Sequence, residues 1–170
     1  MSLFESFLSQ FQKAFIVDSR WKIFLKGFVN TMIITLAAAA IGILIGVVIA
    51  VFRYMASQKD PRKKRTFGSA VIGVIDRLMA AYVAVIRGTP LAIQLMIMAF
   101  IVLRGVSDGM VVAIVAFGLN SGAYVSEVIR AGIQSVDGGQ MEAGRSLGLN
   151  RVDAMRLIIL PQALKNILPA

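Results

Sequence analysis

The longest apolar stretch of the sequence, residues 27–52, most narrowly limits the folds open to this chain. Asn30, Thr31 and Thr35 are its polar side chains, and Arg53 ends it. A helix of roughly 20 apolar residues crosses the hydrocarbon core of a bilayer, about 30 Å thick. With 58% hydrophobic residues in 170, the sequence predicts an all-α integral membrane protein, a multi-pass helical bundle.

Small residues gather on this predicted helix, at residues 37–40 and at Gly42 and Gly46. Small side chains let the backbone of a second helix approach closely in a membrane. Two partners for this face stay open, namely a second subunit and another helix of the same chain.

A short basic loop, residues 53–65, follows the predicted crossing and indicates its direction. Its basic residues are Arg53, Lys59, Arg62, Lys63, Lys64 and Arg65, against the single acid Asp60. Short loops rich in Lys and Arg stay in the cytoplasm. We therefore expect a protein of the cell (cytoplasmic) membrane whose N-terminus lies outside.

Residues 1–26 form a separate N-terminal segment with apolar side chains at helical spacing. An amphipathic helix is predicted, and it either lies at the membrane surface or packs against the bundle. A cleaved signal peptide is disfavoured because Glu5 stands where such peptides are basic.

Residues 66–103 are too many for one straight crossing, since a helix rises about 1.5 Å per residue. Thr89 and Pro90 provide a break at which Thr89 can cap a helix that begins with Pro90. We expect a cytoplasmic or interfacial helix at 66–86, with Asp76 and Arg77 at its polar edge, and a crossing at 90–103. The alternative is one long kinked helix with Arg87 inside the protein, where an arginine is a functional candidate.

The next crossing is predicted from Met110 to about Ile129, after an outer turn at residues 104–109. Asn120, Tyr124 and Glu127 interrupt its apolar run at positions i, i+4 and i+7, which share one helix face. Such a row faces a bundle interior or a watery path rather than lipid. A polar contact network and a substrate path both remain open.

A polar segment, residues 134–153, separates this crossing from the last one. Turn residues lead into a short helix at 140–147, and Gly148 fits the position after a helix C-cap. Asn150 or Asp153 can cap the following apolar helix, which contains Pro161.

Three motifs in this sequence resemble those of known transport proteins. Glu142-Ala143, Gly148 and Ile159-Leu160-Pro161 resemble the cytoplasmic EAA loop in the membrane subunits of ABC importers. The stretch from Arg87 to Leu91 with Gln94, and that from Asn120 to Tyr124 with Glu127, Arg130, Gly132 and Ile133-Gln134-Ser135-Val136, resemble the polar amino-acid permeases of that family. The resemblance covers residues 27–170, the incomplete transmembrane domain, with its coupling loop at 134–153.

The resemblance implies a permease subunit of an ATP-driven amino-acid importer, coupled through residues 138–161 to a separate cytoplasmic ABC ATPase. The expected coupling residues are Gly139, Glu142 as the charged contact, Ala143 and Gly144 as the close-approach surface, and Gly148 as the elbow. The expected path residues are Arg87, Gln94, Asn120, Tyr124 and Glu127.

The resemblance also implies further partners: a second permease subunit, identical or homologous, and an extracytoplasmic solute-binding protein that delivers the amino acid. Members of the family continue beyond the point that matches Ala170, so the chain looks truncated at its C-terminus. The alternative function is a truncated membrane interaction protein that transports nothing, and an inert hairpin is the alternative for the coupling loop.

Composition argues against several other classes of function. With no Cys and no His, the commonest metal ligands and general base are missing, so we expect no enzyme activity, no metal site and no cofactor. The excess of 18 Lys+Arg over 9 Asp+Glu is better explained by anionic membrane lipid than by nucleic acid.

Overall fold

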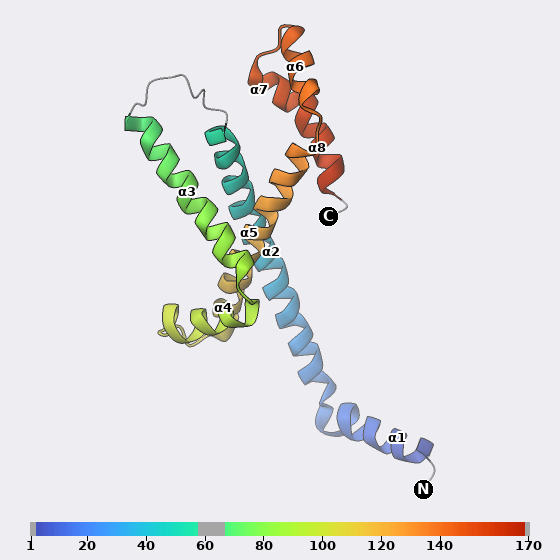
Figure 1. The fold of residues 1–170 in the computed structure, drawn as a ribbon. Helices are drawn as coiled ribbons and strands as arrows, with labels where there is room; N and C mark the ends of the chain where they lie inside the picture. The colour runs from blue at the N-terminus through green and yellow to red at the C-terminus, as the bar shows by residue number, and fades with distance from the viewer. Residues whose placement is uncertain (1–2, 58–66, 169–170) are drawn as a thin grey trace.

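The computed structural model describes residues 3–57 and 67–168, and within these ranges every regular element is a helix. In chain order the elements are α1 (Leu3–Phe11), η1 (Gln12–Ile16), η2 (Val17–Ser19), α2 (Trp21–Ser57), α3 (Phe67–Gly88), α4 (Leu91–Ile97), η3 (Met98–Val102), α5 (Gly109–Gln134), α6 (Gly138–Ser146), α7 (Arg151–Ala154), η4 (Met155–Ile159) and α8 (Leu160–Ile167). Figure 1 shows α2, α3 and α5 leaning against one another, with α6 and α7 at one end. The predicted helical bundle is confirmed.

Helix α2 contains the whole predicted crossing at 27–52 and continues beyond both of its ends. Its 37 residues measure about 55 Å, well over the thickness of the hydrocarbon core. In the described ranges, three helices are long and apolar enough to cross a membrane, namely α2, α3 and α5.

The small residues of α2 face α5 of the same chain. A Cβ atom added at Gly46 would lie 2.5 Å from Val125 Cγ1, and one at Gly42 would overlap with Ser121. Likewise, a Cβ atom added at Gly118 of α5 would lie 2.8 Å from Cγ2 of Ile41 on α2. The close approach of α2 and α5 therefore depends on these glycines. Of the two partners considered for this face, intrachain packing is confirmed.

The helix after the basic loop that is long and apolar enough to cross a membrane is α3, which argues against the predicted surface helix at 66–86 and crossing at 90–103. Helix α3 is long and apolar enough to span, whereas the apolar helix Leu91–Val102 falls below that length and measures about 18 Å. Asp76 suggested a surface helix, but its Oδ1 lies 3.4 Å from Nε of Arg53 on α2. A paired carboxylate is tolerated where an isolated one is not.

The predicted break after α3 is confirmed, but Thr89 does not cap the next helix. Its hydroxyl donates to the carbonyl oxygen of Val85 at 2.9 Å, a common arrangement for threonine at the end of a helix. Pro90 is the N-cap of α4, with an extended backbone. Figure 1 shows α4 turned sharply away from α3, which excludes one continuous kinked helix.

The N-terminal segment leads away from the other helices. Figure 1 shows α1 projecting from the start of α2, away from α3 to α8. Phe7, Phe11, Phe15 and Phe24 form a row of ring contacts and stay exposed. Packing against the bundle is therefore not seen for the described part of α1, and its role at a membrane surface stays a prediction.

The C-terminal helices return beside α5. Helices α7, η4 and α8 follow one another from Arg151 to Ile167, near the predicted start of the last crossing. A Cβ atom added at Gly132 of α5 would overlap with Ile167 of α8, so these helices also meet at a glycine. In Figure 1 the C-terminal end of α2 and the N-terminal end of α3 lie at the same end of the molecule as α6.

Candidate functional site

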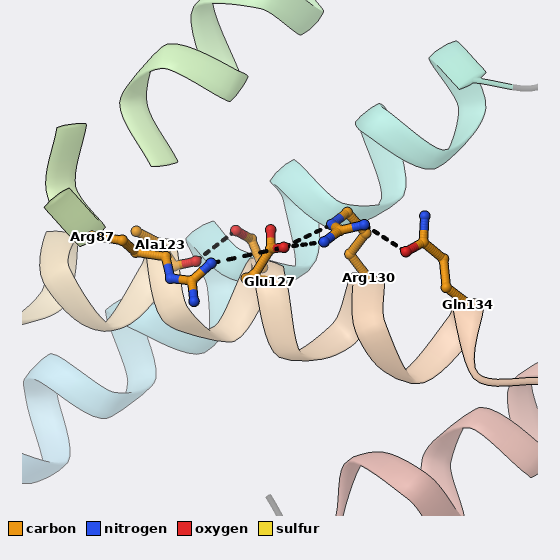
Figure 2. A network of polar contacts seen from close by, with 6 residues as sticks. Arg87, Ala123, Glu127, Arg130 and Gln134 are labelled. Carbon is orange, nitrogen blue, oxygen red and sulfur yellow. Dashed lines mark hydrogen bonds and ion pairs between the residues drawn. The ribbon is translucent and has the colours of Figure 1, made fainter. Parts of the chain in front are cut away.

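A row of charged and polar side chains runs along α5 (Figure 2). The Glu127 carboxylate lies between Arg87, near the end of α3, and Arg130, one turn further along α5. Its Oε1 is 3.7 Å from Arg87 Nη1 and accepts a hydrogen bond from Arg130 Nε at 2.9 Å. Arg130 Nη1 also donates to Gln134 Oε1 at 2.5 Å. We call these four residues the charged row.

The charged row holds two guanidinium groups against one carboxylate, which leaves one positive charge in excess. Glu127 is the more enclosed partner, with 20% of its side chain exposed against 43% for Arg87. A charge removed from water requires a partner, and Glu127 has two. The row can therefore accept a second carboxylate without leaving Glu127 unpaired.

Gln94 joins the break after α3 to α5. Its side-chain amide is buried, with the residue 8% exposed. Nε2 donates to Thr89 Oγ1 at 2.8 Å and to the carbonyl oxygen of Ile86 at 2.7 Å, and Oε1 accepts from Asn120 Nδ2 at 3.1 Å. Buried polar groups satisfied in this way fix the elements that carry them.

The remaining predicted path residue, Tyr124, lies beside the charged row. Its ring centroid is 5.4 Å from Arg87 Cζ, a cation–π distance, and the residue is 47% exposed. Arg87 and Gln94 thus contact the same face of α5 that bears Asn120, Tyr124 and Glu127. The structure brings all five predicted path residues together.

A groove of about 560 Å³ adjoins this cluster between α2 and α5. Thr31 and Thr35 of α2 line it opposite Asn120 and Tyr124. Thr31 Oγ1 also donates to the carbonyl oxygen of Gly27 at 2.9 Å, as expected for a threonine within a helix. Sequence reasoning missed the place of both threonines in the groove, although their separation by one turn is a signal that they share a face.

The polar segment after α5 begins with a capped helix. Asp137 is the N-cap of α6, and its Oδ1 accepts a hydrogen bond from the Gly139 amide at 2.6 Å. Gly139 therefore lies in the first turn of α6 and is exposed. The helix covers Gly138–Ser146, close to the predicted range 140–147.

Gly148 ends this helix in the left-handed conformation that its position predicted, with φ of +89°. The Gly148 amide donates to the Arg145 carbonyl at 3.0 Å, and the Leu149 amide donates to the Gly144 carbonyl at 3.2 Å. This pair of bonds is a Schellman motif. Of the two candidate caps for the next helix, Asn150 is the one used, since its Oδ1 accepts from the Val152 and Asp153 amides.

The predicted coupling residues differ in the direction they face. Glu142 and Ala143 are exposed on α6, whereas Gly144 is buried within the chain. A Cβ atom at Gly144 would lie 2.7 Å from Ile158 Cδ1, so its close approach is to Ile158. Sequence reasoning missed two exposed apolar residues, Leu147 at 84% and Val152 at 73%. Single exposed apolar side chains are common on protein surfaces, so nothing in the sequence marked these two.

A family model described as "Binding-protein-dependent transport system inner membrane component" matches residues 68–170. The chain belongs to this family. This inner membrane component is 41% identical over 145 residues to the putative glutamine transport system permease protein of Rickettsia bellii, covering 84% of this chain and 62% of that protein. It is 42% identical over 149 residues to the arginine transport system permease protein ArtQ of Bacillus subtilis, covering 86% and 61%.

Solved structures of ABC transporters share the fold of this inner membrane component. A crystal structure of an amino acid ABC transporter with histidines has a TM-score of 0.74 and 37% identity, covering 96% of this chain and 67% of that chain. The MetNI methionine ABC transporter in an inward facing conformation, at 22% identity, has a TM-score of 0.67 and covers 91% and 68%. The predicted fold, that of the ABC importer transmembrane domain, is confirmed, and the chain spans about 62% of the Rickettsia bellii relative.

Proposed function

We propose that the chain is a permease subunit of an ATP-driven ABC importer for amino acids. It forms part of the translocation path and couples to a separate cytoplasmic ATPase through residues 138–161. One observation carries the proposal: α5 bears Glu127, Arg130 and Gln134 of the charged row and continues, after residues 135–137, into the capped and outward-facing helix α6. A movement of α6 is therefore transmitted through α5 to Glu127, Arg130 and Gln134.

The charged row suits an amino acid because it offers charges of both signs. Arg87 contacts Glu127 at 3.7 Å, a longer and weaker contact than the 2.9 Å bond from Arg130. Arg87 is therefore the partner that a substrate carboxylate can engage, while Glu127 keeps Arg130. The names of the glutamine and arginine permeases to which the chain is similar support amino acids as the substrate class.

The exposed face of α6 suits docking to an ATPase. Glu142 supplies a charged contact, Ala143 permits close approach, and Leu147 adds an apolar side chain that is exposed within this chain. Gly148 and the cap at Asn150 fix the direction of the next helix. Rotation of α6 on the surface of a closing ATPase dimer would thus be passed to α5 and α8 together.

The other proposed partners are a second permease subunit, identical or homologous, an extracytoplasmic binding protein and membrane lipid. The outer faces of α2 and α3 carry exposed apolar residues that suit lipid or a second subunit. The aromatic row from Phe7 to Phe24 suits the lipid interface. The family description, with its dependence on a binding protein, supports the delivery step.

The proposed orientation places the N-terminus and Ser107 outside the cell and Gln140 in the cytoplasm. It is tested with single cysteines, which the chain otherwise lacks. An impermeant thiol reagent added to intact cells should label Ser107→Cys and spare Gln140→Cys and Lys63→Cys. Lys63 lies outside the described residues, whereas Ser107 precedes α5 and Gln140 lies in α6. Labelling of Gln140→Cys with protection of Ser107→Cys would reverse the orientation.

The transport function is tested by reconstitution with an ATPase, a second permease subunit and a binding protein in liposomes. ATP-dependent uptake of labelled glutamine or arginine is expected. Stable assembly of the complex without ATP-driven uptake of any amino acid would instead identify a membrane interaction protein that transports nothing.

A further inference from the structure

A cavity of about 430 Å³ lies where α2, α3 and α5 meet the segment that contains α6 and η4. We call it the junction cavity. Its charged and phenolic walls come from Arg53, Tyr54, Asp76, Arg130 and Asp137. The residues that line it differ from those that line the groove between α2 and α5. The junction cavity is therefore separate from that groove, although Arg130 and Gln134 of the charged row line it.

Arg53 gives the junction cavity an anion-binding group. Its Nε is buried and makes no hydrogen bond within the described residues, although Asp76 Oδ1 lies 3.4 Å away. A buried N–H without an acceptor is costly, and more so on a charged group. Arg53 lines the junction cavity, and its side chain is 27% exposed. A carboxylate is the acceptor that best matches a guanidinium.

The turn before α6 supplies a carboxylate at a fixed position. Asp137 lines the cavity, and its Oδ1 is held by the Gly139 amide at the start of α6. Arg130 is likewise held in place by Glu127 and Gln134. A ligand with a carboxylate beside Arg53 and an ammonium group beside Asp137 matches this arrangement of charges.

Apolar side chains complete the cavity between these charges. Met141 and Met155 line it together with Ile159. Methionine side chains adapt to ligands of different shape, and the volume falls within the usual range for sites of small molecules. The cavity thus combines a fixed recognition of charge with a wall that can adjust to a variable side chain.

We propose that the junction cavity binds a free α-amino acid and that its occupancy slows transport. The regulatory part rests on the proposed function, because it requires the imported amino acid to accumulate on the side of residues 138–161, the coupling segment. Asp137, α6 and η4 supply one part of the wall, and α2, α3 and α5 supply the rest. A bound amino acid therefore bridges the coupling segment to the membrane helices and opposes their relative movement.

Binding is measured with a fluorine label in the assembled transporter. Ser57 lines the junction cavity and Thr35 lines the groove, so Ser57→Cys and Thr35→Cys place a ¹⁹F tag at either site. Titration with L-glutamine and L-arginine should shift the tag at position 57 saturably. Arg53→Gln should weaken this binding about tenfold or more, since hydrogen bonds to charged groups contribute on that order, and should leave the response at position 35 unchanged.

A matched variant separates loss of binding from loss of structure. Asp137→Asn keeps a good helix N-cap but removes the charge, so it should also weaken binding while α6 stays folded. A saturable shift at position 57 produced by phosphatidylethanolamine but by neither amino acid would overturn the inference in favour of a lipid site. No shift with any of these probes would also overturn it.

Regulation is measured as the ratio of uptake into amino-acid-loaded liposomes to uptake into empty ones. The ratio should be well below one for the unchanged chain and closer to one for Arg53→Gln. Equal ratios would overturn the regulatory role while leaving the proposed function intact. Binding at position 57 without any ATP-driven uptake would instead reject the proposed function and leave the binding site standing.

Discussion

The charged row on α5 and the coupling segment around α6 are held in place in different ways. In the charged row, side chains from separate helices satisfy one another, as Arg87 of α3 does with Glu127 of α5. In the coupling segment, local backbone bonds set the geometry, through the cap at Asp137 and the left-handed turn at Gly148. The row can therefore exchange partners without unfolding a helix, whereas the coupling segment moves as a unit.

This difference decides which substitutions each region tolerates. The side-chain contacts of the charged row are lost when a substitution changes a charge, even if the helix backbone stays in place. A turn that requires a positive φ responds to a Cβ atom, whatever the chemistry of the side chain. We therefore expect substitutions in the coupling segment to act through the backbone and substitutions in the charged row to act through charge.

Gly148→Val should have the largest effect. A β-branched residue at φ of +89° is strained by about 1–2 kcal/mol or more, and relief of that strain redirects the helix that follows. We expect the variant to insert in the membrane but to recover almost no ATPase when the complete transporter is purified. Gly148→Asn is the control, since asparagine tolerates this conformation better. Wild-type recovery and substrate-stimulated ATP hydrolysis in the valine variant would remove the coupling assignment.

Glu127→Gln should have the next largest effect, and on uptake rather than on assembly. The amide can still accept a hydrogen bond, but the guanidinium groups of Arg87 and Arg130 lose their counter-charge. We expect the initial rate of amino-acid uptake to fall about tenfold or more, with normal recovery of the ATPase. Glu127→Asp is the matched control, because it keeps the counter-charge of Arg87 and Arg130 and should retain more uptake than Glu127→Gln. Unchanged uptake in Glu127→Gln would favour a polar packing network over a path.

Local features of these two regions could be predicted from the sequence. The shared face of Asn120, Tyr124 and Glu127 follows from helical periodicity alone. The turn at Gly148 follows from the chemistry of glycine after a short helix. Both features depend on residues only a few positions apart, so the local amino-acid sequence is sufficient to predict them.

Features that depend on distant segments could not be predicted. The choice of α3 as the crossing requires the pairing of Asp76 with Arg53 of α2. The burial of Gln94 requires acceptors near the end of α3 and a donor on α5. The inward direction of Gly144 requires η4 to fold back beneath α6. In each case the deciding contact comes from another element.

Glu142→Ala should have a smaller effect than either substitution above. Alanine is the better helix former, so α6 should keep its structure and lose one exposed charge. A charge at the rim of an interface changes affinity modestly and is screened by salt. We expect recovery of the ATPase to fall about two- to fivefold at low salt, with a smaller difference at high salt. Gln140→Ala, on the same helix and also exposed, should match the unchanged chain. Salt-independent loss in both variants would indicate damage to the helix instead.

Gly144→Ala should have the smallest effect, and it tests the inward direction of this residue. The added Cβ atom would lie 2.7 Å from Ile158 Cδ1 and 3.3 Å from Ala154 Cβ. The first neighbour is the end of a flexible side chain that can rotate. Alanine also favours a helix over glycine by roughly 0.5–1 kcal/mol. The two effects oppose each other, so the thermal midpoint of the complex should change little and recovery of the ATPase should stay normal.

Gly144→Leu is the comparison variant, because its bulk has no room against Ala154 and should lower the midpoint. If Gly144→Ala instead reduced ATPase recovery at an unchanged midpoint, Gly144 would belong to the docking surface, and the division of α6 into an inner and an outer face would be wrong.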